Sequence, residues 1–424
     1  MFEFLKRKKK GSGVIALDIG ADRVKSVFFA VEEKLNQAGD VTGKRALIQG
    51  MGEVAQEGGE SPEGMITDIA SVIENCKRSI RLASEQAGRS PAQLLLGVSG
   101  ESIKGGTTIE VFDREDPKSK INLAELHNIL HKLEWRSFAE TRKQVSEEMG
   151  YPEIDCKLMH AAVVDIKIDG YKVANPLGFQ GSQVQISLFN SFAPLPYYGA
   201  LNNIAEELKL ELLGIIPESY ALSRSLEAED PALSAIFIDI GGNATSIAVV
   251  TNGTLRGSKL FGVGGRTFTK RLAVELNLAH KEAEKLKLAY AADKLEPKSK
   301  KIIADLIQND IEVWLEGIVL ALSEFKQVEE LPGKILLTGG GSQLPEFREA
   351  LNHRKWHKKL HFSAKPQASF IKITDMPLLI DDAKRIKAQT NIVPAALVNL
   401  GIELTGEESI VQKTLRKVIG IMQV

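Results

Sequence analysis

The alternation of apolar and polar positions predicts a chain in which strands and helices are mixed. Val14 to Leu17 form an apolar run typical of a buried strand, and the turn Asp18-Ile19-Gly20 and a second strand, Val24 to Ala30, follow it. Residues 63–90 place apolar side chains at helical spacing, and a further apolar run, Leu94 to Val98, comes after them. The chain is therefore predicted to have an α/β fold.

The first strand and turn occur a second time. Residues 235–242 again show an apolar run that ends in Asp-Ile-Gly, and an apolar strand, Ser246 to Val250, follows. A third apolar run, which starts at Ile335, ends in a glycine-rich turn, and residues 267–327, rich in Lys and Glu, are predicted to be helical. This pattern indicates a duplicated strand-turn-strand unit with a later glycine loop.

Composition narrows the function classes. The 424 residues are 43% hydrophobic and 26% charged, with a net charge of -1, so the chain can bury a sizeable core and no nucleic-acid partner is expected. Cys76 and Cys156 lie far apart without metal-site spacing, so neither zinc nor a disulfide framework is expected. No apolar stretch reaches the roughly 18 residues of a spanning helix, and we expect a cytoplasmic protein.

The two hairpins have the residue types that a nucleotide needs. Glycine lets backbone N–H groups approach phosphate closely, and Gly20, Gly241 and Gly242 stand at the turns. Mg²⁺ keeps most of its waters and is held through one or two carboxylates, so Asp18 and Asp239 are predicted to hold it through water.

Two further residues of the hairpins are candidate phosphate ligands. Lys25 would reach a phosphate as a point charge, and Thr245 would donate its hydroxyl. Taken singly, each motif is more often a plain turn or a solvated residue. Two copies about 220 residues apart, followed by a glycine loop, favour a nucleotide site.

This arrangement resembles the actin/Hsp70/sugar-kinase superfamily, and within it the FtsA/PilM group of bacterial actin-like ATPases. Residues 262–270 are similar to that group's GG-x-x-x-T helix start, and residues 282–287 to its EAE-x-x-K helix. The resemblance implies two duplicated ribonuclease-H-like domains that close over ATP and Mg²⁺, with an inserted FtsA-type (SHS2-like) α+β subdomain. It also implies nucleotide contacts in three places: the cleft floor at Gly264, Gly265 and Thr269; ribose or adenine contacts at Glu284 and Lys287; and an adenosine loop at Gly339, Gly340, Gly341 and Ser342. The alternative for Glu284 and Lys287 is an i,i+3 surface pair.

The resemblance also implies a division of the chain. We expect a basic-aromatic tail (1–13), a first actin-like subdomain in two parts (14–93 and 193–234), an inserted subdomain (94–192), a second actin-like subdomain (235–265 and 328–404, the latter returning to the first), a helical nucleotide-side subdomain (266–327) and a C-terminal amphipathic helix (405–424).

The sequence leaves the role within the group open. Residues 97–100 and 169–181 resemble the extra subdomain of FtsA, which favours cell division, whereas Thr245-Ser246 and the placement of Lys25 are more similar to PilM, a pilus-assembly component. A sugar or carboxylate kinase is the alternative from another class. A chaperone and a Rossmann dinucleotide site are disfavoured, because no substrate-binding β-domain follows residue 400 and residues 262–265 lack the third glycine.

Catalysis is expected to be slow if it occurs at all. Glu218, in a segment that resembles the superfamily's EP-x-A helix start, would orient water, although Ser219 replaces the expected proline. The alternative is a helix-starting glutamate that satisfies local N–H groups. We therefore expect at most a slow ATPase that works mainly by binding.

Both ends of the chain are candidates for contact with an anionic membrane. Phe2, Phe4 and Leu5 precede five basic residues, and the segment 408–424 places Leu415, Val418 and Ile419 on one face of a predicted helix, after a capping-box pattern at Thr405. The alternative for the final helix is docking on the protein's own core. The resemblance implies a peripheral protein on the inner face of the cell membrane that self-associates into filaments and binds the FtsZ C-terminal tail or an inner-membrane pilus or division protein.

Overall fold

The fold is described from a computed structural model of the chain. The structure describes residues 13–35, 40–56, 68–100, 103–149, 156–227, 230–386, 389–405 and 409–422. The tail residues Phe2, Phe4 and Leu5 lie outside these ranges.

The first domain is built on a six-stranded sheet in the order β15-β3-β2-β1-β4-β9. Its strands are β1 (Val14–Ile19), β2 (Arg23–Leu35), β3 (Val41–Ala55), β4 (Gln93–Val98), β9 (Glu211–Pro217) and β15 (Leu379–Ile380). Side chains alternate between the faces of β1, so Ile15 and Leu17 pack against α1 (Ile69–Ala87) and α3 (Leu195–Leu208), while Val14 and Ala16 face α4 (Glu218–Glu227) and α9 (Ile392–Leu404). Both faces are covered, which is why β1 is apolar from Val14 to Leu17.

The second domain repeats this plan with a five-stranded sheet in the order β12-β11-β10-β13-β14. Its strands are β10 (Ala235–Ile240), β11 (Thr245–Thr251), β12 (Thr254–Phe261), β13 (Lys334–Thr338) and β14 (Gln367–Phe370). One face is covered by α5 (Gly265–Glu275), α6 (His280–Ala291), α7 (Pro297–Ser323) and α8 (Pro345–His353). The other face, with Phe237 and Val250, joins the same core as α4 and α9.

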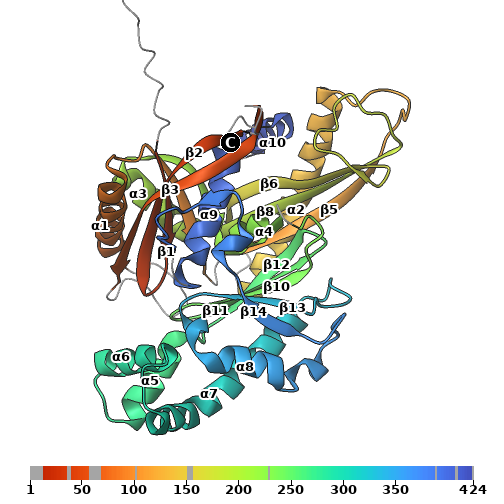
Figure 1. Cartoon of the computed structure of the whole chain (residues 1–424). Coiled ribbons are helices and arrows are strands. Elements are labelled where there is room, and N and C mark those ends of the chain that lie inside the picture. The colour runs from red at the N-terminus through yellow and green to blue at the C-terminus, as the bar shows by residue number, and fades with distance from the viewer. Residues whose placement is uncertain are drawn as a thin grey trace, which may run out of the picture.

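The duplication predicted from the sequence extends to strand register. In the first hairpin Asp18 lies opposite Lys25, and in the second Asp239 lies opposite Ser246. In both domains the first strand also pairs in parallel with a later strand, β4 or β13. Because α4 and α9 lie between the two sheets, the two hairpins face one another across one core (Figure 1). The predicted duplicated α/β fold is confirmed.

The inserted subdomain is a four-stranded antiparallel sheet in the order β5-β8-β6-β7, covered by α2 (Leu123–Met149). Its strands are β5 (Lys104–Asp113), β6 (Cys156–Ile168), β7 (Tyr171–Lys172) and β8 (Gln183–Pro194). The boundary predicted at residue 94 is wrong, because β4 lies between β1 and β9 inside the first sheet. The insertion therefore begins after β4.

The last helix, α10 (Ile410–Met422), packs on the inserted subdomain. Val411, Leu415 and Val418 are buried in the same cluster as Leu130 and Leu133 of α2, and Ile419 packs against that cluster. The prediction that Leu415, Val418 and Ile419 contact a membrane is therefore corrected: the amphipathic pattern is real, but the protein itself covers the apolar face. No helix of the described part of the chain is long and apolar enough to cross a membrane.

The predicted capping box before α10 is also wrong. The hydroxyl of Thr405 donates to the carbonyl of Gly401 at 2.8 Å, at the end of α9. Ser409 caps α10 instead, because its Oγ accepts a hydrogen bond from the N–H of Gln412 at 3.1 Å.

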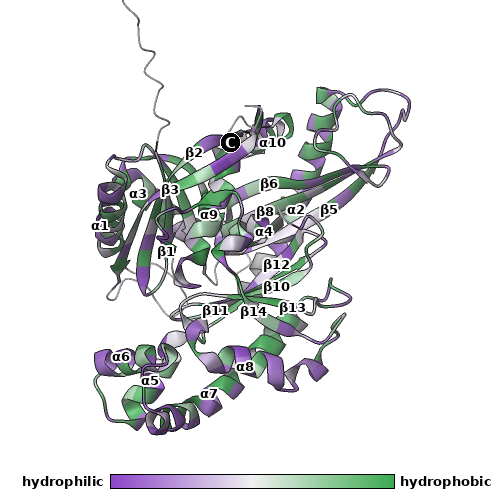
Figure 2. Cartoon of the chain, viewed as in Figure 1, coloured by the Kyte–Doolittle hydropathy of each residue, from purple (hydrophilic) through white to green (hydrophobic). Residues whose placement is uncertain are grey.

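Helix α9 was not predicted. Its residues 392–402 are buried, so its sequence lacks the apolar and polar alternation that marks a surface helix (Figure 2).

The packing of α10 is testable by stability. Leu415→Ala should lower the free energy of unfolding by about 2–5 kcal/mol, because the side chain is fully buried. Ile410→Ala, on the exposed side of the same helix, should change it by no more than about 0.5 kcal/mol. Urea denaturation of both variants measures the difference, and equal midpoints would contradict the docked position of α10.

Candidate functional site

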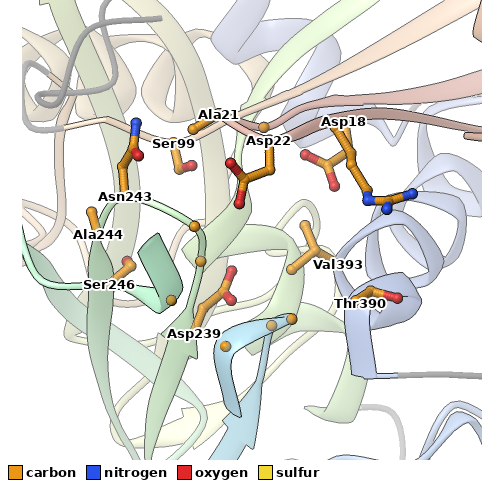
Figure 3. Close-up of a pocket in the computed structure, with 18 of the residues that line it drawn as sticks. Asp18, Ala21, Asp22, Ser99, Asp239, Asn243, Ala244, Ser246, Thr390 and Val393 are labelled. Carbon is orange, nitrogen blue, oxygen red and sulfur yellow. The ribbon is translucent and has the colours of Figure 1, made fainter. Parts of the chain in front are cut away.

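A cavity of about 370 Å³ lies between the two domains. Strand periodicity explains its position: Asp18 continues the row of Val14 and Ala16 that faces α4 and α9, and Asp239 continues the row of Ala235 and Phe237 on the opposite sheet. Acids from both hairpins consequently point into the space between the sheets (Figure 3).

Most residues predicted from the sequence come together here. The predicted site residues that line the cavity are Asp18, Gly20, Lys25, Glu218, Asp239, Gly241, Gly242, Gly265, Glu284, Lys287, Gly339, Gly340 and Gly341. Other lining residues were not predicted, among them Asp22, Arg23, Glu53, Asn243 and Thr390. An acid within the turn after Asp-Ile-Gly was the available signal for Asp22.

Three acids, Asp18, Glu218 and Asp239, and one base, Lys25, form a buried cluster in the cavity lining. Lys25 Nζ donates to Asp18 Oδ2 at 3.2 Å, and both side chains are largely buried. Burial opposes the charged form of Lys25, but the charges of Asp18 and Asp239 outweigh it and raise the pKa of Lys25. The ammonium is thus held firmly charged among carboxyl groups.

The other two acids of this cluster ionise less readily than solvated carboxyl groups. Burial, and then the negative charges of Asp18 and Asp239, raise the pKa of Glu218 well above its usual value. Burial also raises the pKa of Asp239 to about 6, with Lys25 opposing and Asp18 adding to the shift. Within the described part of the chain, Oε1 of Glu218 is buried without a hydrogen-bond partner. The cluster therefore has more acid than its own base compensates, which suits a bound cation.

A direct metal cage is not what this cluster provides. No group of three or more His, Cys, Asp or Glu side chains among the described residues has the arrangement to hold a metal ion. Magnesium typically keeps several of its waters, so an ion held through water by Asp18 and Asp239 fits the residues present.

The second hairpin uses Thr245 differently from the prediction. Its hydroxyl donates to the carbonyl of Val263 at 2.7 Å and accepts from Trp314 Nε1 at 2.9 Å. The side chain is fully buried and lies outside the cavity lining. The expectation that Thr245 donates to a phosphate is therefore corrected: the hydroxyl fastens the hairpin to α7.

The glycine loop after β13 is shaped by close approach. Gly339 has φ +88°, and a Cβ there would lie 2.1 Å from Oδ1 of Asp239, so only glycine fits. The hydroxyl of Ser342 donates to the carbonyl of Gly339 at 2.7 Å, which closes the loop from behind. Ser342 therefore supports the cavity wall rather than lining it.

The start of α5 is clamped onto the second hairpin. A Cβ on Gly264 would come within 2.6 Å of the carbonyl of Gly242, and the N–H groups of Gly265 and Arg266 donate to the carbonyls of Gly241 and Gly242. The predicted role of Gly264 as part of the cleft floor thus becomes a close-packing role behind the lining.

Glu284 and Lys287 are both an ion pair and part of the cavity wall. Lys287 Nζ lies 2.8 Å from Glu284 Oε2, and it donates to the carbonyl of Gly265 at 2.9 Å and to Thr269 Oγ1 at 2.8 Å. Although burial acts in the opposite direction, Lys287 and Thr269 lower the pKa of Glu284. Thr269 is fully buried behind them, so Lys287 fixes the wall and Glu284 is the more open of the pair.

Comparisons with known proteins agree with this architecture. The family model described as "Cell division protein FtsA" matches residues 236–391. The chain is 22% identical over 385 residues to the cell division protein FtsA of Pseudomonas aeruginosa, with 84% of this chain and 85% of that protein covered. It is 24% identical to that of Neisseria meningitidis, with 80% and 81% covered. Among solved structures, a chain of the "PilM-PilN type IV pilus biogenesis complex" superposes with a TM-score of 0.61 at 18% identity, covering 93% of this chain and 99% of that one. The likeness to this last structure shows that the two chains share a fold.

The excess acid in the cavity gives a pH prediction. The folded protein binds the proton of Asp239 more tightly than the unfolded chain does, so this group's contribution to stability is present near pH 4 and is lost as pH rises through about 6. Without nucleotide, Asp239→Asn should therefore be more stable than wild type at pH 7, by on the order of 1–2 kcal/mol, and the difference should shrink toward pH 4.

Chemical denaturation at pH 4, 5, 6 and 7 measures this difference. Asp305→Asn, on the exposed side of α7, controls for the loss of one negative charge. If Asp239→Asn were less stable than wild type at pH 7, the account of the cluster would be contradicted.

Proposed function

We propose that this chain, which is similar in sequence to cell division protein FtsA and in fold to a chain of the PilM-PilN complex, binds Mg-ATP in the interdomain cavity and acts as a membrane-associated adaptor in cell division. The observation that carries the nucleotide proposal is the buried acid cluster between two glycine turns. Three carboxyl groups, one ammonium and an unpartnered acceptor on Glu218 suit a cation with a phosphate chain.

Different residues of the cavity lining would contact different parts of the nucleotide. Gly20, Gly241, Gly242 and Lys25 would hold phosphates, while Asp18 and Asp239 would hold waters of the magnesium ion. Magnesium, when bound, would neutralise charge on the phosphates. The glycine loop, which lines the cavity with Gly339, Gly340 and Gly341, would contact the adenosine together with Glu284. Lys287 would fix the cavity wall behind them.

Glu218 is the candidate for any hydrolytic step. It stands first in α4, shares a hydrogen bond with Asp18 and holds its proton far more tightly than a solvated glutamate. Such a group orients water better than it removes a proton from it, so we expect hydrolysis orders of magnitude below the roughly 1–100 s⁻¹ of kinases.

The adaptor role rests on the relatives. The matches to FtsA proteins support binding to the FtsZ tail, self-association into filaments and recruitment of division proteins. The tail with Phe2, Phe4 and Leu5, which lies outside the described residues, would contact anionic lipid on the inner face of the membrane. Two weak signals anchor better than one, so the tail alone would give reversible attachment.

A PilM-like role is the second candidate. The superposition over 93% of this chain favours it, and so does Ser246, which lies opposite Asp239 where FtsA typically has an acid. In that case the partner would be a peptide of an inner-membrane pilus protein. A sugar or carboxylate kinase would instead show rapid phosphate transfer to a small acceptor.

Nucleotide binding is testable at the glycine loop. Gly340 lines the cavity with an ordinary φ of -65°, so Gly340→Arg is compatible with the backbone but fills the adenosine place. Calorimetry should show at least about a hundredfold loss of ATP affinity, which corresponds to about 2.7 kcal/mol. Gly262→Arg, outside the cavity with open space around it, is the matched control and should bind as wild type does. Unchanged affinity in Gly340→Arg would place the nucleotide elsewhere.

Partner choice is testable in one recruitment assay. Vesicles with anionic lipid are sedimented with the full chain, ATP and either a labelled FtsZ tail peptide or a labelled peptide from a pilus membrane protein. We expect the FtsZ peptide to sediment only with the chain present. Deletion of residues 2–10 should reduce this at low salt, and should have less effect at raised salt, where the charges of the tail are screened. Recruitment of the pilus peptide alone would establish the second candidate, and recruitment of neither would refute the adaptor proposal.

A further inference from the structure

The turn of the first hairpin carries an acid that reaches across the cavity. A Cβ on Gly242, in the second hairpin, would come 1.9 Å from Oδ2 of Asp22, so the Asp22 carboxylate occupies the space beside this glycine turn (Figure 3). The backbone around Asp22 is fixed: the side chain of Gln56 donates to the carbonyl of Gly20 at 2.8 Å, and the N–H of Gln56 donates to the carbonyl of Asp22 at 2.8 Å. The carboxylate is thus presented by a held turn.

Arg266 is the counter-ion of this carboxylate. It lies in the first turn of α5, and its Nε forms an ion pair with Oδ1 of Asp22. Its other nitrogens donate to Oδ1 of Asn243 at 3.1 Å and to the carbonyl of Ala21 at 3.4 Å. One guanidinium therefore joins the first domain to the second at the edge of the cavity.

We infer that the carboxylate of Asp22 stands in for a nucleotide phosphate, and that bound nucleotide exchanges places with it as the partner of Arg266. Carboxylate and phosphate are the two anions that a guanidinium pairs with through its planar set of N–H groups. The glycine turn beside Asp22 is the kind of backbone that accepts an anion. The ligand is the outer phosphate of a nucleoside polyphosphate, and the inference rests on the proposed nucleotide binding.

The exposure of the pair suits exchange. The side chains of Asp22 and Arg266 are 41% and 30% exposed, and ion pairs this open to water contribute little stability. A phosphate with more charge can therefore displace the carboxylate. Since the pair spans both domains, the nucleotide that breaks it also releases a contact between them, which couples occupancy to domain arrangement.

The direction in which one substitution changes the affinity for Mg-ATP tests this inference. Asp22→Asn removes the competing charge and keeps the shape, so the affinity for Mg-ATP should rise about three- to tenfold. Arg266→Gln should lower it about tenfold or more. In the double variant the gain from Asp22→Asn should disappear, because the cation for which it competes is gone.

Two controls separate this effect from others. Adenosine, which has no phosphate, should bind equally to wild type and both single variants. Glu32→Gln removes one negative charge from an ion pair with Arg45 in the same domain, away from the cavity, and should leave Mg-ATP affinity unchanged.

Calorimetric titration of wild type and the variants with Mg-ATP and with adenosine measures these affinities, and each outcome has one meaning. If wild type binds neither Mg-ATP nor adenosine, the proposed nucleotide function fails and the inference with it. If wild type binds but Asp22→Asn has unchanged affinity, no displacement occurs and the inference alone fails. A weaker affinity in Asp22→Asn would show that Asp22 helps to hold the ligand, which also overturns the inference.

Discussion

The two sheets of this protein pack against the same pair of helices, and the rest of the site depends on that shared core. Val14 and Ala16 of β1 and Phe237 of β10 belong to one buried cluster with α4 and α9. Strand periodicity then requires that the acid at the end of each central strand points toward its counterpart. The first residue of α4, Glu218, reaches the same point. The packing of apolar side chains thus places three carboxyl groups together, although their mutual repulsion opposes it.

That repulsion gives the cavity its chemistry. Lys25 compensates part of the charge, and burial drives Glu218 and Asp239 toward their neutral forms. A cation with a phosphate chain would offset the same repulsion, which is the physical basis of the proposed nucleotide binding. Asp22 and Arg266 form a second, more exposed electrostatic contact at the edge of the cavity. Charged side chains therefore determine both the chemistry of the buried cluster and the contact between the domains.

Local sequence patterns predicted the two hairpins, but they predicted neither helix α9 nor the docking of α10 on the inserted subdomain. Asp18, Asp239 and the glycine turns follow from short apolar runs, because strand, acid and turn lie within a few residues. Helix α9 was missed because it is apolar on all sides. The amphipathic face of α10 was visible in the sequence, but no local pattern says whether lipid or protein covers such a face.

Contacts between distant segments explain the remaining differences. The sequence made Thr245 a candidate phosphate donor, but in the structure its one hydroxyl proton is donated to the carbonyl of Val263, and its oxygen accepts from Trp314 Nε1. Asp22 and Arg266 lie in different domains, and nothing near either residue in the sequence indicates the other. Such pairs depend on how the two sheets meet, which composition and periodicity do not encode.

The most direct test of the account is a crystal structure of the full chain grown with Mg²⁺ and a non-hydrolysable ATP analogue. If nucleotide binds as proposed, the electron density will show the triphosphate between Gly20 and the Gly241-Gly242 turn, with the metal's waters on Asp18 and Asp239 and the adenosine beside Gly340. An empty interdomain cavity at saturating analogue, or an analogue bound away from both hairpins, would contradict it.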